Sequence, residues 1–408
     1  MLMLSRSLIQ RALRSMAGVT LGSLVLVSAP AQAQPRPSLS QLHQQLEALQ
    51  QQVTAQQTTI TAQQTTITNL STRLGLVEAN PALDLGPYVS VELSPLNGLP
   101  GPHILWTGAN LHVRSGSGAT DGALTGQGNL VVGYNEFSRG SGSHNLVVGQ
   151  GHTFSSFGGL VAGAFNTISA QYASVTGGHS NSASGAFASV SGGFRNGASG
   201  SWASVSGGSE NGASGQQASV SGGVSNTASG QNASVSGGFL NTANGAQASV
   251  SGGFVNFASG PQASVSGGLD NNAIGQNASV SGGLRNFAFG NGSSVSGGSD
   301  NDASGEGSSV SGGAINRAFG GGASVSGGRA NRANGVTASV GGGDSNEART
   351  TRSSVHGGFS NRATGEGSSV SGGQNNESSS QNSSVSGGAN RSATVINSWR
   401  GGSLFQAN

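Results

Sequence analysis

The chain has 408 residues, and its composition differs from that of an ordinary globular enzyme: it contains 72 Gly, no Cys, 8% charged residues and 5% aromatic residues, whereas average domains contain about 7% Gly and about 25% charged residues. The low charge argues against a solvated disordered chain, the scarcity of large apolar residues argues against one thick core, and the lack of Cys excludes disulfide bonds, thiolate catalysis and zinc-finger sites. The formal net charge of +2 is too small to predict binding to nucleic acid or to an anionic membrane, so the composition indicates a repetitive architecture of small residues.

Residues 1–33 contain the three parts of a secretory signal peptide. Three Arg precede the apolar stretch 16–29, and a small-x-small cleavage site follows at 31–33. The apolar stretch is shorter than the roughly 18 to 20 residues that a membrane-spanning helix needs. We therefore expect an exported chain that begins near Gln34 and has no integral membrane segment after cleavage.

Residues 34–79 contain a heptad pattern with a 3-4 spacing of its core positions, which predicts an α-helical, left-handed coiled-coil stalk about 60 Å long. The predicted oligomerisation positions are Leu39, Leu42, Leu46, Leu49, Val53, Gln56, Ile60, Gln63, Ile67, Leu70, Leu74 and Val77. The two Gln in this seam cost stability and set register, and the pattern is compatible with two or three strands. The alternative is a monomeric amphipathic helix packed on the rest of the chain, which the narrow apolar stripe disfavours.

Residues 80–128 are rich in Pro, which ends the helix and predicts a linker. Within it, the segments 103–106 and 110–113 are separated by Thr-Gly-Ala and predict a short hairpin. Because the terminal units of a stacked array need atypical residues to close the core, we expect this hairpin to cap the first coil of the domain that follows.

A repeat of 15 residues, A-S-V-S-G-G-x-x-N-x-A-S-G-x-x, begins at Ala173, and looser copies of its strand and turn occur at 129–133 and 145–149. Val recurs at 175, 190, 205 and every fifteenth position to 385, always preceded by Ser. This period is too short for helix pairs and too regular for a sandwich, so residues 129–395 are predicted to form an all-β parallel β-solenoid with 15-residue coils. Residues 396–408 are left as a C-terminal cap or tail.

Within each coil, alternation places Val175 inside and the hydroxyls of Ser174 and Thr176 outside. Asn181 suits either a turn or an internal ladder of amides stacked between coils. Ala183 begins a recurring small-residue pattern that predicts a second inner strand, and the Gly pairs are expected to supply the positive φ of a tight corner.

Charged residues 15 positions apart have opposite signs in most cases, as direct neighbours in stacked coils should. One like-charged pair, Arg317 with Arg332, interrupts this pattern. The alternating sets are Arg195 and Glu210; Asp270, Arg285 and Asp300; Asp302 and Arg317; and Arg332, Glu347, Arg362 and Glu377.

A core of Val, Ala and Gly is thin, because ordering 15 residues costs on the order of 15 to 30 kcal/mol of backbone entropy whereas one buried Val contributes about 1.5 to 3 kcal/mol. Packing of several solenoids side by side would bury a further face. The candidate interface patch lies where apolar residues gather at variable positions and consists of Phe254, Val255, Phe257, Leu269, Leu284, Phe287 and Phe289.

The repeat, with A-x-G-x-x followed by a short strand around Val and then Gly, resembles the head repeat of trimeric autotransporter adhesins and related haemagglutinin-like proteins over residues 129–395. The resemblance implies a left-handed β-roll, association of three chains, an adjoining coiled-coil stalk, and binding to host matrix or to other cells. The chain departs from the family in having 15 residues per repeat where 14 are usual, A-S-V-S-G-G in place of S-V-A-I-G, and a stalk before the head. The resemblance does not extend to the family's C-terminal membrane anchor.

Catalytic and metal-binding patterns are lacking in the sequence. The seven His lie in separate contexts that mostly predict solvated side chains, the Ser columns include no nucleophile elbow, and the carboxylates belong to charge ladders. We therefore expect a non-enzymatic protein without cofactors: a secreted or bacterial outer-surface adhesion protein that forms a homotrimer and contacts a cell surface, matrix or glycan. The alternatives are a passive extracellular spacer or coat protein and, ranked lower, a hydroxyl lattice that binds ice or another crystal face.

Overall fold

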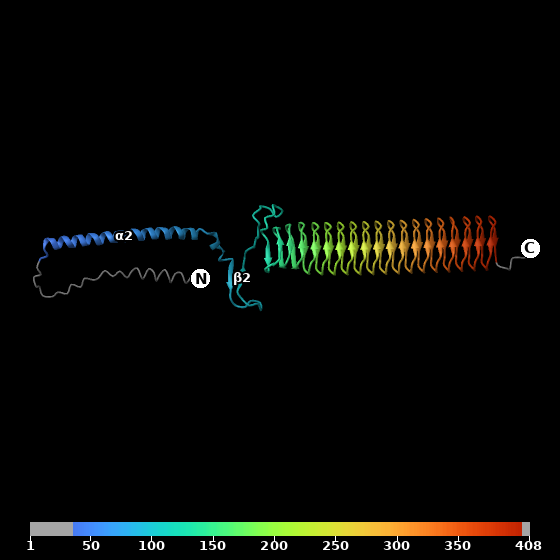
Figure 1. Ribbon diagram of the computed structural model, residues 1–408, viewed down its shortest axis with the longest axis horizontal. Coiled ribbons are helices and arrows are strands. Elements are labelled where there is room, and N and C mark those ends of the chain that lie inside the picture. The colour runs from blue at the N-terminus through green and yellow to red at the C-terminus, as the bar shows by residue number, and fades with distance from the viewer. Residues whose placement is uncertain (1–35, 402–408) are drawn as a thin grey trace, which may run out of the picture. The chain divides into compact units, whose positions relative to one another are not determined.

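A computed structural model describes residues 36–401, so the predicted signal peptide lies outside the described residues. The chain divides into two compact units, one ending at Asn110 and the other beginning at Leu111. The first contains a long helix and a hairpin, and the second is a parallel β-solenoid (Figure 1). The helix and the solenoid predicted from the sequence are therefore both confirmed.

Helix α2 spans Leu39–Glu78 and is followed by a short 3-10 helix, η1, at Pro81–Leu85. Ser38 and Gln41 form a capping box in which the side chain of each accepts a hydrogen bond from the backbone N–H of the other. Many Thr of α2, such as Thr54, donate a hydrogen bond from the hydroxyl to the backbone carbonyl four residues earlier. These polar side chains are therefore satisfied within the helix itself. None of the residues of α2 is buried in the single chain.

The hairpin of the first unit differs from the prediction. Strand β2 (His103–Trp106) pairs antiparallel with β1 (Val89–Glu92) rather than with residues 110–113. The connection folds back at Asn97 and Gly98, which have φ of 53° and 80°, and Leu96 and Leu99 on either side exchange two backbone hydrogen bonds of 3.0 Å. Asn-Gly is the sequence that a two-residue turn with positive φ at both positions requires, so this dipeptide determines the pairing.

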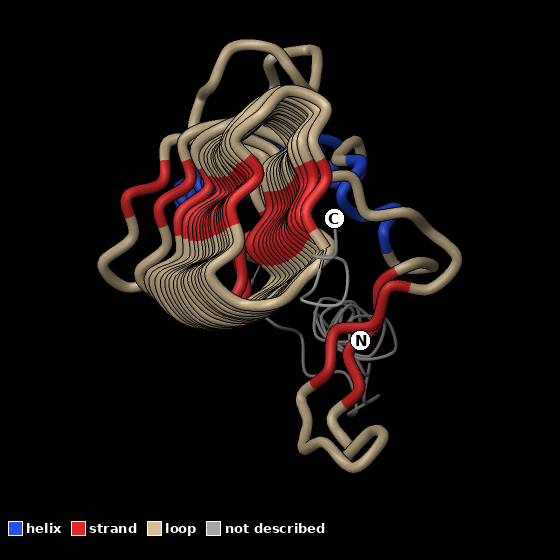
Figure 2. Tube along the Cα trace, turned by 90° about the vertical axis from the view of Figure 1, so that its right-hand side faces the viewer, coloured by secondary structure: helices blue, strands red, loops and turns tan. Residues whose placement is uncertain are grey.

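The solenoid is built from two sheets of parallel strands, and each coil contributes one strand to each sheet (Figure 2). We refer to the sheet of odd-numbered strands as the Val sheet and to the sheet of even-numbered strands as the Ala sheet. The Val sheet begins with β3 (Leu130–Val132), β5 (Leu146–Gln150) and β7 (Leu160–Ala164), continues as fifteen Ser-Val strands from β9 (Ser174–Val175) to β37 (Ser384–Val385), and ends with β39 (Trp399–Arg400). The Ala sheet begins with β4 (Arg139–Gly140), β6 (Thr153–Phe154), β8 (Thr167–Ile168) and β10 (Ser182–Ala183), and continues in two-residue strands to β36 (Glu377–Ser378) and β38 (Ser392–Ala393).

Strand pairing joins Ser189 to Ser204 and Gly197 to Gly212, and the same offset of 15 holds from Thr167 to Arg400. The first coils are less regular, because Leu130 pairs with Leu146 and Leu146 with Leu160. A third column of single parallel bridges follows the corner between the sheets, for example His179 to Phe194. The last pair extends the Val sheet to Arg400, beyond the predicted boundary at residue 395.

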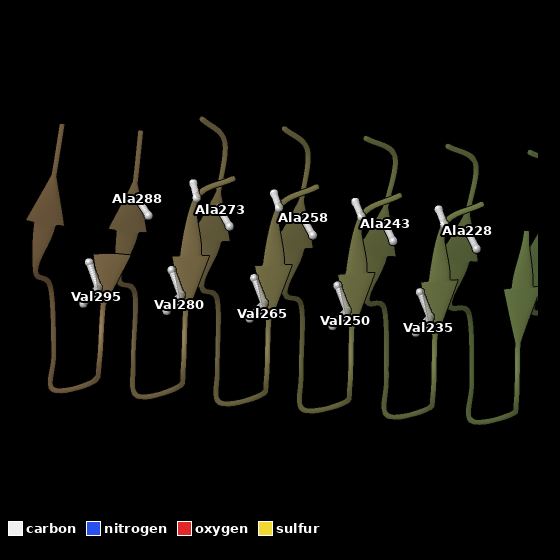
Figure 3. Packing of buried hydrophobic residues seen from close by; sticks show 14 of the residues in the cluster. Ala228, Val235, Ala243, Val250, Ala258, Val265, Ala273, Val280, Ala288 and Val295 are labelled. Carbon is white, nitrogen blue, oxygen red and sulfur yellow. The ribbon is translucent and has the colours of Figure 1, made fainter. Parts of the chain in front are cut away.

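The interior lies between the two sheets and is as thin as the composition predicts. The Val column and the Ala column both lie in this interior (Figure 3). Val190 and Ala198 are fully buried, whereas Ser189 is half-buried and Ser191 is exposed. The alternation of side chains read from the sequence is therefore correct in both strands.

The recurring Asn residues form an internal ladder of amides. The sequence allowed either this ladder or a turn, and the structure shows the ladder. Asn196 accepts at Oδ1 a hydrogen bond from the backbone N–H of Asn211 at 3.0 Å and donates Nδ2–H to the carbonyls of Gly192 and Gly208 at 2.9 and 3.0 Å. Each amide thus satisfies buried backbone groups of its own coil and of the next. The column runs from Asn166 to Asn376, where the N–H of Arg391 is the last donor.

The corners depend on left-handed backbone. The second Gly of each pair is required: Gly193 has φ of 89°, and a Cβ there would lie 2.2 Å from the carbonyl oxygen of Gly208. The first Gly of the pair, such as Gly192, has open space at this position, so only one of the two fills the predicted role. Two further corner residues per coil, such as Arg195 and Trp202, take φ of 54° and 56°, although neither is Gly.

The first coil is closed by the segment that precedes it within the second unit. His144 Nε2 accepts a hydrogen bond from the backbone N–H of Ser115 at 3.0 Å, and His144 Nδ1 lies 3.1 Å from the carbonyl oxygen of Thr120. The N–H of Thr125 donates to the hydroxyl of Ser143 at 3.0 Å. The capping function that the sequence assigns to the hairpin is therefore supplied, in these contacts, by residues 115–125.

Candidate interaction surfaces of the solenoid

Every coil carries the same set of outward positions, because the inward ones are fixed by the Val, Ala and Asn columns. Two outward positions lie on the Val sheet and two on the Ala sheet, and the rest lie at the corners. A side chain on one coil is the direct neighbour of the residue 15 positions later, since the strands pair in that register. The outer surface is therefore a set of parallel columns, and each column can be read for its chemistry.

The outer face of the Val sheet is nearly uniform. One of its two columns is Ser in every strand from Ser174 to Ser384. The other column, from Thr176 to Ser386, is exposed throughout and departs from Ser or Thr only at Gly341 and His356. This face offers a lattice of hydroxyls with about 4.8 Å between coils and about 7 Å along the strand.

The outer face of the Ala sheet and the adjoining corner vary from coil to coil and carry the predicted charged neighbours, three pairs of which form ion pairs. Arg195 and Glu210 lie 3.7 Å apart, Arg285 Nε and Asp300 Oδ1 lie 3.0 Å apart, and Arg362 Nε and Glu347 Oε2 lie 3.5 Å apart. Both members of the first pair are solvated and one member of each other pair is about half exposed, so each pair contributes only about 1 kcal/mol. The like-charged neighbours Arg317 and Arg332 are paired directly in the strand register, as the sequence predicts.

Further ion pairs join positions that the sequence analysis did not connect. Arg352 and Glu366 lie 2.6 Å apart at a corner, and Arg329 and Asp344 lie 4.0 Å apart in the column of single bridges. The second pair has the same offset of 15 as the predicted ones and was detectable from the sequence. The first pair has an offset of 14, because it joins two different corner columns.

The predicted interface patch divides between columns. Phe254, Leu269 and Leu284 lie in the column of single bridges, and Val255 lies at the adjacent corner. The remaining members, Phe257, Phe287 and Phe289, lie on the outer face of the Ala sheet or at its edge. Phe254, Leu269 and Phe289 are exposed and the other four are half-buried.

Two aromatic columns were missed. Phe157, Tyr172, Phe187 and Trp202 follow one another along one corner with ring centroids 5.1 to 5.4 Å apart, the first pair edge-to-face and the other two stacked. Phe165, His179 and Phe194 form a second column, and the guanidinium of Arg195 lies 4.8 Å from the centroid of Phe194. The spacing of 15 in the first column was a sufficient signal. Both columns belong to the first coils, where they link the irregular start of the solenoid to its regular part.

His152 contradicts the expectation of solvated His, because it is fully buried and takes the place of an Asn in the internal ladder. Its Nδ1 accepts the backbone N–H of Asn166 at 3.3 Å, and its Nε2 lies 3.0 Å from the carbonyl oxygen of Val148. A neutral imidazole with its proton on Nε2 satisfies both contacts. In the described part of the chain, no three His, Asp or Glu side chains gather in a way that could hold a metal ion.

The twelve predicted oligomerisation positions all lie on α2 and are exposed in the single chain. Leu46, Ile60 and Leu74, for example, are each more than half exposed. An apolar stripe follows the 40 residues of α2. Most helices in proteins are stabilised by packing of their apolar face, and long exposed apolar surfaces are typical of interaction sites. Within residues 36–401 we find no helix that combines the length and the apolar character of a membrane span.

One carboxyl on the Ala sheet has a perturbed pKa. Burial raises the pKa of Asp302 above its ordinary value, and this effect exceeds the lowering by the hydroxyl of Ser304 and by the positive charge of Arg317. Asp302 lies beside Phe287 in the strand register, so part of its desolvation comes from an aromatic neighbour.

The chain matches no known protein-family model, and a search of curated proteins found no significant relative. Its function must therefore be inferred from its own surfaces.

Proposed function

We propose that this protein is an exported, non-enzymatic adhesion protein whose β-solenoid is a rigid frame for a contact surface on a cell, a matrix or a glycan. The observation that carries this proposal is the presence of β-branched apolar side chains at strained corner positions, where Ile315 is 42% exposed and Val255 is half-buried. Val255 and Ile315 occupy a corner column in which most other coils have a polar or charged residue and no other coil has a β-branched one, and both are left-handed, with φ of 57° and 61°. A β-branched residue there costs about 1 to 2 kcal/mol, and the other coils use residues that are not branched at Cβ. Contact with a partner would account for this strain.

The same proposal assigns α2 to a coiled-coil stalk. Its exposed seam has the 3-4 spacing that a second or third helix would cover, and Gln56 and Gln63 would set the register. The resemblance to trimeric autotransporter adhesin heads favours three chains, a left-handed roll with 15-residue coils, and a location outside the cell or on a bacterial outer surface. Export rests on the signal sequence at 1–33.

The stalk is tested by the mass of the purified protein in solution. We expect a dimer or trimer for the unmodified chain and a monomer for Ile60→Asp, because a carboxylate in the seam would be buried without a partner. Thr65→Asp, on the opposite face of the helix, is the matched control and should leave the mass unchanged. A monomer for the unmodified chain would refute the stalk.

The adhesive surface is tested by binding of the full-length oligomer to cells, matrix proteins and a glycan array. Binding to at least one class of surface is expected, and its loss in Val255→Asn and Ile315→Asn would connect it to the strained corner. If the oligomer binds none of the cells, matrix proteins or glycans in a broad panel, a role as a passive spacer is favoured.

A second candidate function rests on the uniform face of the Val sheet. Its two hydroxyl columns, one exposed and one half-buried, would suit an ordered crystal face or an ordered water layer, although Ser is less suited than Thr to ice. A thermal hysteresis measurement decides this function, and a value indistinguishable from that of a control protein would remove it.

A further inference from the structure

A hollow on the Ala sheet combines aromatic rings with charged side chains. It has a volume of about 300 Å³ and is lined by Phe287, Phe289, Asp300, Asp302 and Arg317. These residues come from three successive coils, so the hollow exists only because the coils stack in register. None of the five is an inward residue of the repeat, and the core does not require them.

The floor of the hollow is an aromatic pair. Phe287 and Phe289 have parallel rings, with an angle of 1° between their planes and 5.4 Å between their centroids. The preceding coil has Asn272 and Ile274 at these positions, and the following coil has Asp302 and Ser304. Phe289 remains 43% exposed, so its ring is accessible to a ligand.

The rim of the hollow is polar and electrically balanced. Asp300 pairs with Arg285 at 3.0 Å and accepts a hydrogen bond from the hydroxyl of Ser299 at 2.5 Å. Asp302 accepts a hydrogen bond from Ser304 and faces Arg317 in the strand register. With Arg285, which lies outside the lining and pairs with Asp300, each of the two carboxylates of the hollow has one guanidinium neighbour. The carboxylates are strong hydrogen-bond acceptors and the guanidinium groups are strong donors, and they lie side by side.

We propose that this hollow binds a neutral hexopyranose unit of a glycan. A pyranose ring has one face of C–H groups that can lie on an aromatic surface and an equatorial rim of hydroxyls that donate to carboxylates and accept from guanidinium groups. The volume suits one such ring, and the balanced charge disfavours ligands whose recognition depends on a formal charge. This inference rests on the proposed adhesive function and names the ligand class at one site.

The test uses the full-length protein and saturation-transfer NMR with the methyl glycosides of glucose, galactose, mannose and N-acetylglucosamine. Glucuronic acid and glucosamine serve as the anionic and cationic comparison probes. Phe289→Ser installs the commonest residue at this position in the other coils, and Asp302→Asn removes one carboxylate at constant shape. Phe359→Ser is the matched control, because Phe359 is a similarly exposed Phe in a different column.

We expect at least one neutral glycoside to bind, with affinity reduced about tenfold or more in Phe289→Ser and in Asp302→Asn and unchanged in Phe359→Ser. Circular dichroism and thermal unfolding of each variant would establish that the fold is retained. Preference for either charged sugar, equal binding by all four proteins, or no binding of any neutral glycoside would overturn the proposal.

The two proposals fail in distinguishable ways. If the oligomer adheres to surfaces but no neutral glycoside binds in the hollow, the hexose site is wrong and adhesion stands. If glycosides bind in the hollow but the oligomer adheres to no surface, the site stands and adhesion is wrong.

Discussion

The same coils form the outer faces of the Val sheet and of the Ala sheet, yet the residues on the first face are nearly constant and those on the second vary from coil to coil. From Ser174 to Ser384 the Val sheet presents a nearly constant set of hydroxyls, whereas the Ala sheet changes among Gly, Thr, Phe, Asn and charged residues. Both faces lie over the same interior of Val, Ala and Asn. The inward columns are constant because folding constrains them, and we attribute the variation on the outer face of the Ala sheet to contacts with partners.

The largest effect on stability is expected from a substitution in the interior that the two sheets share. Asn256→Ala removes an acceptor for the N–H of Asn271 and donors to the carbonyls of Gly252 and Gly268. Leaving these buried groups unsatisfied should lower the free energy of unfolding by about 3 to 5 kcal/mol, measured by urea denaturation. Asn272→Ala, on the outer side of β22 (Asn272–Ala273), is the control and should change it by less than about 0.5 kcal/mol. Similar losses in both variants would mean that the Asn ladder is not the stabilising element.

A gain in stability is expected at the strained corner beside the Ala sheet. Val255→Asn places at φ of 57° a residue that tolerates left-handed backbone, and should raise the free energy of unfolding by about 1 kcal/mol. The same substitution should weaken surface binding if the strain is retained for contact. The measurement pairs a thermal melt with the adhesion assay, and a variant that is destabilised would contradict the assignment of strain.

A smaller, pH-dependent effect is expected on the Ala sheet itself. Because burial raises the pKa of Asp302 in the folded chain, the folded state binds this proton more tightly than the unfolded state does. Stability from this group is therefore full at acidic pH and is lost as the pH rises from the ordinary carboxyl range through the raised pKa. Asp302→Asn should melt higher than the unmodified chain at pH 7, and the difference should shrink toward pH 3. A lower melting temperature at pH 7 would show that the attraction of Arg317 outweighs burial.

The smallest effect is expected on the constant face. Gly341 and His356 occupy the exposed column of the Val sheet without loss of the fold, so Ser251→His should change the free energy of unfolding by no more than about 0.5 kcal/mol. A loss of 1 kcal/mol or more in denaturant titrations would mean that folding keeps this column constant.

The sequence predicts the solenoid well because its period makes each column visible. The inward Val, the outward Ser and the neighbours Arg195 and Glu210 all follow from alternation and from the offset of 15. The hairpin was mispaired because the Asn97-Gly98 turn signal was overlooked. The hollow around Phe287 was not predictable, since it depends on how closely a corner residue, Asp300, approaches the sheet face once the intervening Asn301 turns inward.

The most direct test of the central claim, that the variable face carries the contacts, compares adhesion by three full-length proteins. One is the unmodified chain, one carries Phe257→Thr, Phe287→Thr and Phe289→Ser on the Ala sheet, and one carries Ser251→His on the Val sheet. Each replacement occurs naturally in the same column of another coil, so all three should melt at similar temperatures. We predict that only the Ala-sheet variant loses binding to cells or glycans. Retained binding in that variant, or an equal loss in the Val-sheet variant, would contradict the claim.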